Sequence, residues 1–328
     1  MKNKKRVEEI LGHYSFLTDP QKEKLVRLLN TGRAGGSGYL VILPVDQGFE
    51  HGPGSSFEKN PPAYDPSYFV KLAVEGGCSA YAAPLGALES VYEETQKINL
   101  PTILKVNSHE LMMPDEEDPF PAVTAGVQDA LRLKCVAVGF TIYPGSSHSR
   151  EMYQQLRDLT RDARAAGLLV VVWAYPRGSG LPRFTGLDQK TVESALDVIC
   201  YGVHIACQLG AHIVKCKPTT PYVVLPRSVK ENLYKDLYIQ GEESSQSRMR
   251  LIKGDLSERT RKVIQSAFNG KRIVIHSGGA KKEISDLLEE IQDLKRGGSF
   301  GAIVGRNAFQ RPFEEGVELL HKIEDIYS

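Results

Sequence analysis

The chain has 328 residues, with 41 Lys and Arg against 40 Asp and Glu, a length that fits two average domains or one large single-core fold. The balanced charge gives no electrostatic basis for binding nucleic acid or an anionic membrane. Five cysteines, without a CxxC pair, indicate a reducing cytoplasm rather than a disulfide framework or a zinc site. The N-terminus lacks the apolar core of a signal peptide, and the longest strongly apolar run, Leu168–Trp173, is too short to cross a bilayer. We therefore expect a soluble cytoplasmic protein.

Residues 1–38 are predicted to form a helical extension that ends in a glycine-rich turn, Gly32–Gly38. Beyond this extension, short runs rich in β-branched residues alternate with segments of helical spacing. The predicted strands are Tyr39–Val45, Cys78–Ala83, Thr102–Val106, Cys135–Ile142, Leu168–Ala174, Ala211–Cys216, Arg272–His276 and Gly301–Val304. The predicted helices are Pro66–Glu75, Leu88–Lys97, Pro121–Leu133, Ser149–Ala166, Thr191–Gln208, Ser257–Phe268, Lys281–Arg296 and Phe313–Tyr327.

Eight consecutive strand–helix units in a chain of this length predict one (β/α)8 TIM barrel over residues 39–328. A doubly wound sheet would also alternate, but the chain has no GxGxxG turn. Residues ~218–254 fall outside the repeat and are interpreted as a long insertion after the sixth strand. A lid over the barrel mouth and a disordered surface loop both fit the composition of this insertion.

Polar residues follow the predicted strands at their C-terminal ends, where a barrel of this type places its active site. Asp46 follows the first strand and can orient substrate hydroxyls or steady a protonated imine, or it caps a turn. Lys105 ends the third strand, and we interpret it as an ion-pair partner of Asp46. Trp173 and Tyr175 share one face of the fifth strand. Tyr175 is a candidate general acid/base, and an aromatic cap on the barrel core is the alternative.

Two lysines stand at the end of the sixth strand, and alternation places Lys215 and Lys217 on the same face. Crowding and partial desolvation both lower the pKa of a lysine from its usual ~10.4. A neutral amine is a nucleophile toward carbonyls, which is how Schiff-base chemistry begins. The pair therefore predicts an imine-forming lysine, with an ion-paired lysine at a strand end as the alternative.

Glycines follow the last two strands, in the segments Ser277-Gly278-Gly279 and Gly305-Arg306. Glycines let the backbone approach an anion closely, and arginine adds paired hydrogen bonds. The loops after strands seven and eight are also the common phosphate site of this fold. Together the two segments predict a phosphate site, although each alone is compatible with a simple turn.

Five segments resemble the archaeal-type (DhnA-like) class I fructose-bisphosphate aldolases. They are Leu43–His51, Trp173–Arg177, Ile213–Lys217, Ser277–Gly279 and Gly305–Arg306. The lead-in residues 31–33 and 37–40 are most similar to the bacterial branch of that family. The resemblance spans residues ~30–328 and keeps the order of its motifs.

The resemblance implies a metal-independent aldolase of glycolysis and gluconeogenesis that needs no cofactor, binds a phosphorylated sugar and forms homo-oligomers. It implies that Lys217 forms the imine, that Tyr175 moves the proton at carbon–carbon cleavage, and that Asp46 hydrogen-bonds the substrate near the imine. Gln47 stands where archaeal members of the family usually have histidine. This difference concerns the detailed contacts with the substrate and not the imine chemistry. The other implied contacts are Trp173 and Lys215 in the pocket, His51 and Arg177 at the far part of the sugar, and Ser277, Gly278, Gly279, Gly305 and Arg306 at the phosphate of the ketose end.

Three alternatives stay open at this point. A related Schiff-base lyase or transferase, such as a transaldolase-like synthase or a thiolase acting on a phosphorylated diketone, would share the lysine and the phosphate site. A non-catalytic phosphosugar-binding protein would share the pocket alone. A metal-dependent aldolase would need a histidine cluster, and the eight histidines show no HxxH or comparable spacing.

Overall fold

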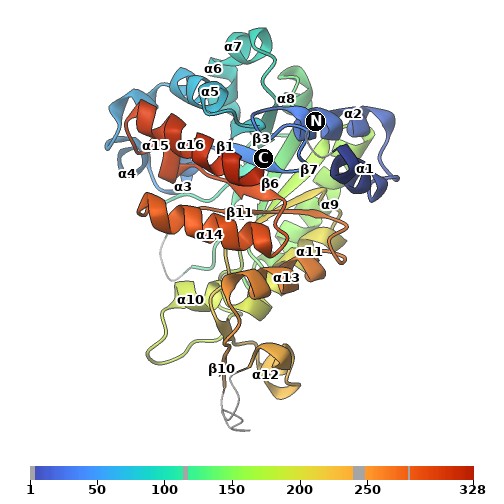
Figure 1. Ribbon diagram of the computed structural model, residues 1–328, viewed down its shortest axis with the longest axis vertical. Coiled ribbons are helices and arrows are strands. Elements are labelled where there is room, and N and C mark those ends of the chain that lie inside the picture. Colours follow the sequence, from blue (N-terminus) through green and yellow to red (C-terminus); the bar gives the residue numbers. More distant parts are fainter. Residues whose placement is uncertain (1–3, 114–116, 239–247, 280) are drawn as a thin grey trace.

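The computed structural model describes residues 4–113, 117–238, 248–279 and 281–328. Eight parallel strands close into one barrel (Figure 1), which confirms the predicted (β/α)8 architecture. In the order in which they neighbour one another, they are β1 (Leu40–Pro44), β2 (Ala80–Pro84), β3 (Thr102–Lys105), β6 (Ala137–Ile142), β7 (Leu169–Ala174), β8 (Ile213–Cys216), β11 (Ile273–Ser277) and β12 (Gly301–Ile303). Each strand overlaps one of the eight predicted runs. The runs predict the strands because a strand that is buried on both faces needs continuous apolar residues.

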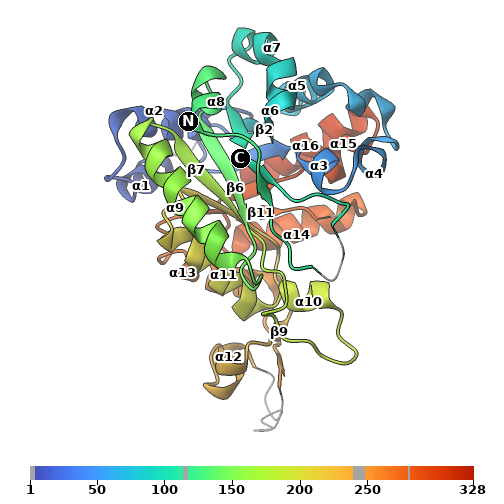
Figure 2. The same ribbon diagram turned by 180° about the vertical axis from the view of Figure 1, so that it is seen from behind.

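Helices surround the barrel, as the alternation requires. Figure 2 shows α9, α11 and α13 together on one side of it. None of the helices in the described part of the chain is long and apolar enough to cross a membrane. The longer outer helices are α5 (Pro66–Glu75), α9 (Ser149–Ala165), α11 (Leu196–Gln208), α13 (Leu256–Ser266), α14 (Ile284–Arg296) and α16 (Phe313–Tyr327). The shorter ones are α3 (Gln47–Glu50), α4 (Pro53–Phe57), η1 (Pro61–Tyr64), α6 (Leu85–Ser90), α7 (Tyr92–Lys97), α8 (Val127–Arg132), α10 (Gln189–Glu193) and α15 (Arg306–Phe309).

The predicted helix 88–97 is divided at Val91 between α6 and α7. Two further predicted helices are wrong in part. In the segment 121–133 only α8 is helical, because Ala122–Val123 form strand β5 and pair antiparallel with β4 (Asn107–Ser108). The segment 191–208 is divided into α10 and α11, because Thr220 pairs with the backbone between these two helices. In both places a contact with a distant segment overrides the local helical pattern.

The N-terminal extension closes the barrel at the end opposite the polar strand ends. It contains α1 (Lys4–Gly12) and α2 (Asp19–Asn30), whose apolar side chains share one core cluster with inward-facing residues of the barrel strands. The Tyr14 hydroxyl donates to the carbonyl of His212 at 2.6 Å and accepts from the N–H of Ile273 at 2.8 Å. The Gln21 amide donates to the carbonyl of Leu168 at 2.9 Å. The extension thus pairs backbone groups at the starts of three strands, which would otherwise be buried without partners.

The insertion after β8 projects from the lower end of the molecule in both views (Figures 1 and 2). Its described part contains β9 (Tyr222–Val223), α12 (Pro226–Lys230), η2 (Lys235–Leu237) and β10 (Arg250–Leu251), and β9 pairs antiparallel with β10. Residues 239–247 of the predicted insertion lie outside the described residues. Val224 packs in a small apolar cluster with Leu181 and Val192 from the segment that follows β7. The described part is therefore a folded element packed on that segment rather than a structureless surface loop.

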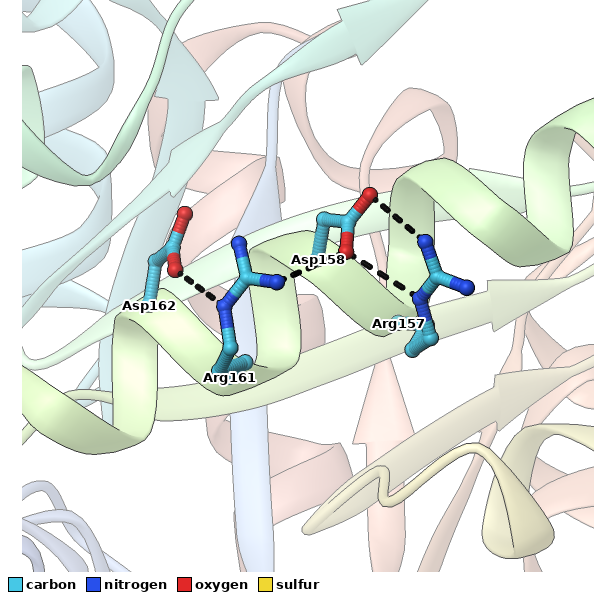
Figure 3. A network of polar contacts seen from close by, with 4 residues as sticks. All are labelled: Arg157, Asp158, Arg161 and Asp162. Carbon is cyan, nitrogen blue, oxygen red and sulfur yellow. Dashed lines mark hydrogen bonds and ion pairs between the residues drawn. The ribbon is translucent and has the colours of Figure 1, made fainter.

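The outward face of α9 carries a row of ion pairs (Figure 3). Arg157 bonds Asp158 through two nitrogens at 3.1 and 3.0 Å, and Arg161 bridges Asp158 at 3.0 Å and Asp162 at 2.8 Å. All four side chains are exposed to water, where charge attraction is screened. This network keeps the outer face of the helix soluble and contributes little to stability.

His212 makes the stability of the fold depend on pH. It is fully buried beside β8, its Nδ1 accepts a hydrogen bond from the N–H of Val170 at 2.8 Å, and burial lowers its pKa to about 3. In the unfolded chain this histidine titrates near pH ~6.5, so below that pH the unfolded state binds more protons than the folded state. Its contribution to stability is therefore complete above pH ~6.5 and is lost as the pH falls toward 3.

We expect the free energy of unfolding to fall by about 2 kcal/mol between pH 6.5 and 5 because of this histidine. Urea unfolding at pH 7 and pH 5 measures the drop, which should be smaller in His212→Gln than in the wild type. His13→Gln, at an exposed position, serves as the control and should keep the full drop. Equal drops in all three proteins would contradict this assignment.

Candidate functional site

A cavity of about 270 Å³ opens where the barrel strands end. Twelve of the thirteen site residues predicted from the sequence line this cavity. They are Asp46, Gln47, His51, Tyr175, Arg177, Lys215, Lys217, Ser277, Gly278, Gly279, Gly305 and Arg306. They follow, or stand at the C-terminal ends of, five strands that are far apart in the sequence and that only the closed barrel brings together.

Lys217 follows β8 and is largely buried, with a quarter of its side chain exposed. Its Nζ lies 3.1 Å from a carboxylate oxygen of Glu193. Burial lowers the pKa of Lys217, and the nearby Arg177 guanidinium lowers it further, while Glu193 opposes the shift. The main cation acting on Lys217 is thus Arg177 rather than Lys215, on which the sequence interpretation rested. A lowered pKa increases the fraction of neutral amine, which is the nucleophilic form.

Lys215 lies inside the barrel on β8. Its Nζ lies 5.1 Å from the ring centroid of Trp173 and 5.5 Å from that of Tyr175, both within the range of cation–π attraction. Burial lowers the pKa of Lys215, and the carboxylates of Asp46 and Glu50 oppose this shift. Trp173 is the one predicted residue that does not line the cavity, because its ring is buried in the barrel core beneath the lysines.

The predicted ion pair between Lys105 and Asp46 is wrong. The Lys105 ammonium is buried and donates to the main-chain carbonyl of Asn107 and to its side-chain oxygen, the latter at 3.3 Å. The carboxamide of Asn107 in turn bonds both backbone groups of Thr141 on β6, at 2.9 and 2.7 Å. Lys105 therefore ties β3 to the start of β4 and leaves Asp46 to the cavity.

Tyr175 stands immediately after β7 and lines the cavity together with Ser277. Burial raises its pKa well above the usual value, and the carboxylates of Asp46 and Glu50 raise it further. At neutral pH the side chain is accordingly a protonated phenol. It can donate a proton first, and it can accept one only after positive charge has developed nearby.

Two carboxylates lie four residues apart at the end of β1. Asp46 is buried at the start of α3 and Glu50 ends that helix. Burial raises the pKa of Glu50, and the neighbouring Asp46 raises it further. His51 follows, with its pKa lowered by burial and by the cations Arg306 and Arg177. Glu50 lines the cavity but was not assigned a role from the sequence, because one glutamate in a loop carries no signal of its own.

The glycine segments form a cradle of free amides. The N–H groups of Gly278, Gly279 and Gly305 donate to no backbone acceptor among the described residues. A side chain at Gly305 is excluded, since its Cβ would lie 2.7 Å from the carbonyl oxygen of Pro44. Asn307 joins the two segments, because its side chain donates to the carbonyl of Gly278 and accepts from the N–H of Lys282, both at 3.0 Å. With the Arg306 guanidinium beside it, this cradle suits an anion such as phosphate.

Glu193 contacts Lys217 but was not among the site residues predicted from the sequence. It ends α10, only 13% of its side chain is exposed, and it contacts Lys217 and, at 3.8 Å, Arg177. Its segment carried no strand-end signal and was read as part of a longer helix. Glu193 stands behind Lys217 and is not part of the cavity lining. The residues that line the cavity without having been predicted are Pro44, Glu50, Ser194, Pro218, Thr220, Lys282, Glu290 and Ile303.

No cluster of metal ligands accompanies this cavity. Within residues 4–113, 117–238, 248–279 and 281–328, no group of three or more His, Cys, Asp or Glu could hold a metal ion. All five cysteines are free and buried. The chemistry available here is that of an amine, a phenol, carboxylates and an anion cradle.

Comparison with known proteins shows that this chain is similar to aldolases. The model of the family described as "DeoC/LacD family aldolase" matches residues 40–311. A relative from Chlamydia muridarum, named "Probable fructose-bisphosphate aldolase class 1", is 39% identical over 315 residues, covering 92% of this chain and 83% of the relative. A relative from Thermoproteus tenax, named "Fructose-bisphosphate aldolase class 1", is 31% identical over 275 residues, 84% of either chain.

A solved structure supports the same placement. An archaeal fructose-1,6-bisphosphate aldolase, described with its catalytic lysine covalently bound to the carbinolamine intermediate of the substrate, superposes with a TM-score of 0.69 at 27% identity. The match covers 93% of this chain and 99% of that one.

Proposed function

This chain belongs to the DeoC/LacD family of aldolases, and we propose that it is a class I fructose-bisphosphate aldolase. It would cleave fructose 1,6-bisphosphate reversibly into dihydroxyacetone phosphate and glyceraldehyde 3-phosphate, in glycolysis and gluconeogenesis. The observation that carries the proposal is Lys217, an amine of lowered pKa that shares one cavity with Tyr175 and an anion cradle. The relatives named as class 1 fructose-bisphosphate aldolases support the choice of substrate.

The reaction begins with imine formation. The neutral amine of Lys217 attacks the C2 ketone of the open-chain sugar, and the uptake of one proton with the loss of water gives a protonated imine. Ser277, Gly278, Gly279, Gly305 and Arg306 hold the phosphate on the ketose end. The bound phosphate holds C2 of the sugar close to Nζ of Lys217. The attack on C2 therefore starts from an oriented complex rather than from a bimolecular encounter.

Cleavage then draws electrons into the iminium. The iminium carries a positive charge near Tyr175. This charge offsets the carboxylates that raise the pKa of the phenol, and it therefore favours the phenolate. The phenol releases its proton to solvent, and the resulting phenolate removes the proton of the C4 hydroxyl. The C3–C4 bond then breaks, and the electron pair enters the imine as an enamine. Asp46 accepts a hydrogen bond from a substrate hydroxyl near the imine. Protonation of the enamine and hydrolysis release dihydroxyacetone phosphate.

The remaining predicted residues shape the rest of the pocket. His51, neutral because its pKa is lowered, and Arg177 contact the sugar beyond the scissile bond, and Gln47 adjusts those contacts. Lys215 supplies a cation beside Asp46, held over the buried Trp173 ring. Trp173 thus acts through Lys215 and not by touching the substrate.

The test is covalent trapping. The protein is incubated with dihydroxyacetone phosphate, reduced with borohydride and digested, and the adduct is located by peptide mass spectrometry. We expect the adduct on Lys217, and we expect cleavage of the bisphosphate to persist in the presence of a chelator. An adduct elsewhere, no adduct at all, or loss of cleavage on chelation would refute the proposal.

Arg306→Met is expected to raise KM for fructose 1,6-bisphosphate about 10- to 100-fold and to change kcat less. The loss of a charge-assisted hydrogen bond to phosphate costs about 1.5–3 kcal/mol, and ~1.4 kcal/mol corresponds to a tenfold change. Steady-state kinetics measure the split between KM and kcat. Arg157→Met, on the exposed face of α9, is the matched control. An unchanged KM would remove Arg306 from the phosphate site.

Cytoplasmic location and homo-oligomeric assembly are part of the same proposal. The five free, buried cysteines suit a reducing compartment. Light scattering on the purified protein measures the oligomeric state, and a monomer would contradict this part of the proposal.

A further inference from the structure

Glu193 occupies a position that the proposed chemistry leaves without an assignment. Its Oε2 accepts a hydrogen bond from Lys217 Nζ at 3.1 Å and lies 3.8 Å from Arg177 Nε. Its side chain is only 13% exposed, so bulk water has little access to the contact. A carboxylate so close to the reacting nitrogen is within reach of the carbon to which that nitrogen bonds.

The backbone on either side of Glu193 is held by the insertion that follows β8. The backbone N–H of Thr220 donates to the carbonyl of Ser194 at 2.7 Å, and the Thr220 hydroxyl donates to the carbonyl of Thr191 at 2.9 Å. Asp197, buried at the start of α11, accepts from the N–H groups of Val224 at 3.1 Å and Leu225 at 2.7 Å. The end of α10, where Glu193 stands, is therefore fixed from both sides by residues 220–225.

We propose that Glu193 is the proton-transfer residue for imine formation at Lys217, and that residues 220–225 of the insertion keep it in place. This inference rests on the proposed aldolase function, and it gives the insertion a role in that function. Tyr175 then serves the carbon–carbon step, and the two proton transfers have separate residues.

The step balances in protons and charge. The Lys217 ammonium gives one proton to Glu193, and the freed lone pair of Nζ forms a bond to C2 of the substrate. A second proton passes from Nζ to the C2 oxygen, which gives a neutral carbinolamine. The Glu193 carboxyl then returns its proton to the C2 hydroxyl, the C2–O bond breaks, and water leaves. The products are the iminium of Lys217 and the Glu193 carboxylate, with the same total charge as at the start.

The charged groups around Lys217 predict the effect of removing the carboxylate. Glu193 favours the ammonium form, whereas Arg177 and Lys190 disfavour it, and the Tyr175 ring lies 6.0 Å away. Without the carboxylate the pKa of Lys217 falls further. The pH above which the amine reacts therefore shifts to lower values.

The experiment measures the rate of adduct formation with dihydroxyacetone phosphate by rapid mixing and borohydride quench, from about pH 6 to 9. Glu193→Gln keeps the shape of the side chain but cannot exchange a proton with Lys217 or the substrate. It should slow imine formation about 10²-fold, and the rising limb of its pH–rate profile should move to lower pH. Glu193→Asp retains a carboxylate and should return the limb toward the wild-type pH. Glu231→Gln, an exposed ion-pair residue of the insertion, is the matched control and should leave rate and limb unchanged.

Thr220→Val gives an independent test that leaves the carboxylate in the chain. It removes the hydrogen bond from the Thr220 hydroxyl to the carbonyl of Thr191 and should slow imine formation several-fold. This test remains available if Glu193→Gln does not fold. If Glu193→Gln forms the imine at the wild-type rate and with the wild-type pH–rate profile, this inference is overturned and the aldolase proposal stands. If only Thr220→Val folds, the same result in that variant overturns it. Absence of a Lys217 adduct in the wild type would overturn both.

Discussion

Lys217→Met is expected to lower kcat/KM for fructose 1,6-bisphosphate by about 10⁴-fold or more, because the covalent route to the products is lost. Methionine has a similar length and an unbranched chain, so it fits the largely buried site at the end of β8. Glu193 keeps its contact with Arg177 in this variant, so no carboxylate is left buried without a cation. The loss of activity therefore reports on the amine and not on a collapsed pocket.

Coupled assays of cleavage and borohydride trapping measure this effect together, and both signals should disappear. Lys230→Met, which removes an exposed lysine on α12, is the matched control and should retain both. Thermal unfolding shows whether the Lys217 variant is folded. Residual cleavage within tenfold of the wild type by a folded Lys217→Met protein would mean that another residue forms the covalent bond.

Tyr175→Phe should form the imine but cleave the C3–C4 bond about 10²- to 10⁴-fold more slowly, the range for loss of a general acid/base. Phenylalanine preserves the ring over which Lys215 and Lys217 lie, at 5.5 and 6.0 Å from its centroid. Only the hydroxyl is lost. The variant thus tests the phenolic proton of Tyr175 while the packing of the ring is kept.

Single-turnover experiments with fructose 1,6-bisphosphate distinguish the two steps. In Tyr175→Phe, borohydride should trap the bisphosphate itself on Lys217, because the imine accumulates ahead of the slow cleavage. Tyr201→Phe, at a tyrosine of α11 that is 60% exposed, is the control and should behave as the wild type. Unchanged turnover in Tyr175→Phe would assign the C4 proton to another residue, and loss of the adduct would place Tyr175 in imine formation instead.

The barrel could be predicted because its signals are local. Buried parallel strands require continuous apolar runs, and eight such runs separated by helical spacing leave few other folds. The strand ends could be predicted for the same reason. Strand alternation correctly placed Lys215 with Ile213 on the inner face of β8, and the glycines after β11 and β12 line the same cavity as this lysine.

The contacts between these segments could not be predicted in the same way. Alternation directs Trp173 toward the barrel axis but does not say how deep its ring lies, and the packed core keeps it out of the cavity. Lys105 was assigned to Asp46 by charge alone, whereas its ammonium bonds Asn107, two residues further along the chain. Ion pairs follow from distance and burial, which charge patterns do not contain.

The sequence by itself therefore determined the barrel, the lysine on its sixth strand and the glycine segments beside it, since each depends on residues adjacent in the chain. Only the tertiary structure decided which groups surround that lysine. Glu193 reaches Lys217 because Thr220 interrupts a continuous helical pattern and fixes the end of α10. The N-terminal extension closes the barrel because Tyr14 and Gln21 meet backbone groups of three distant strands. In each case a residue without a local signal gained its role from packing between segments distant in the chain.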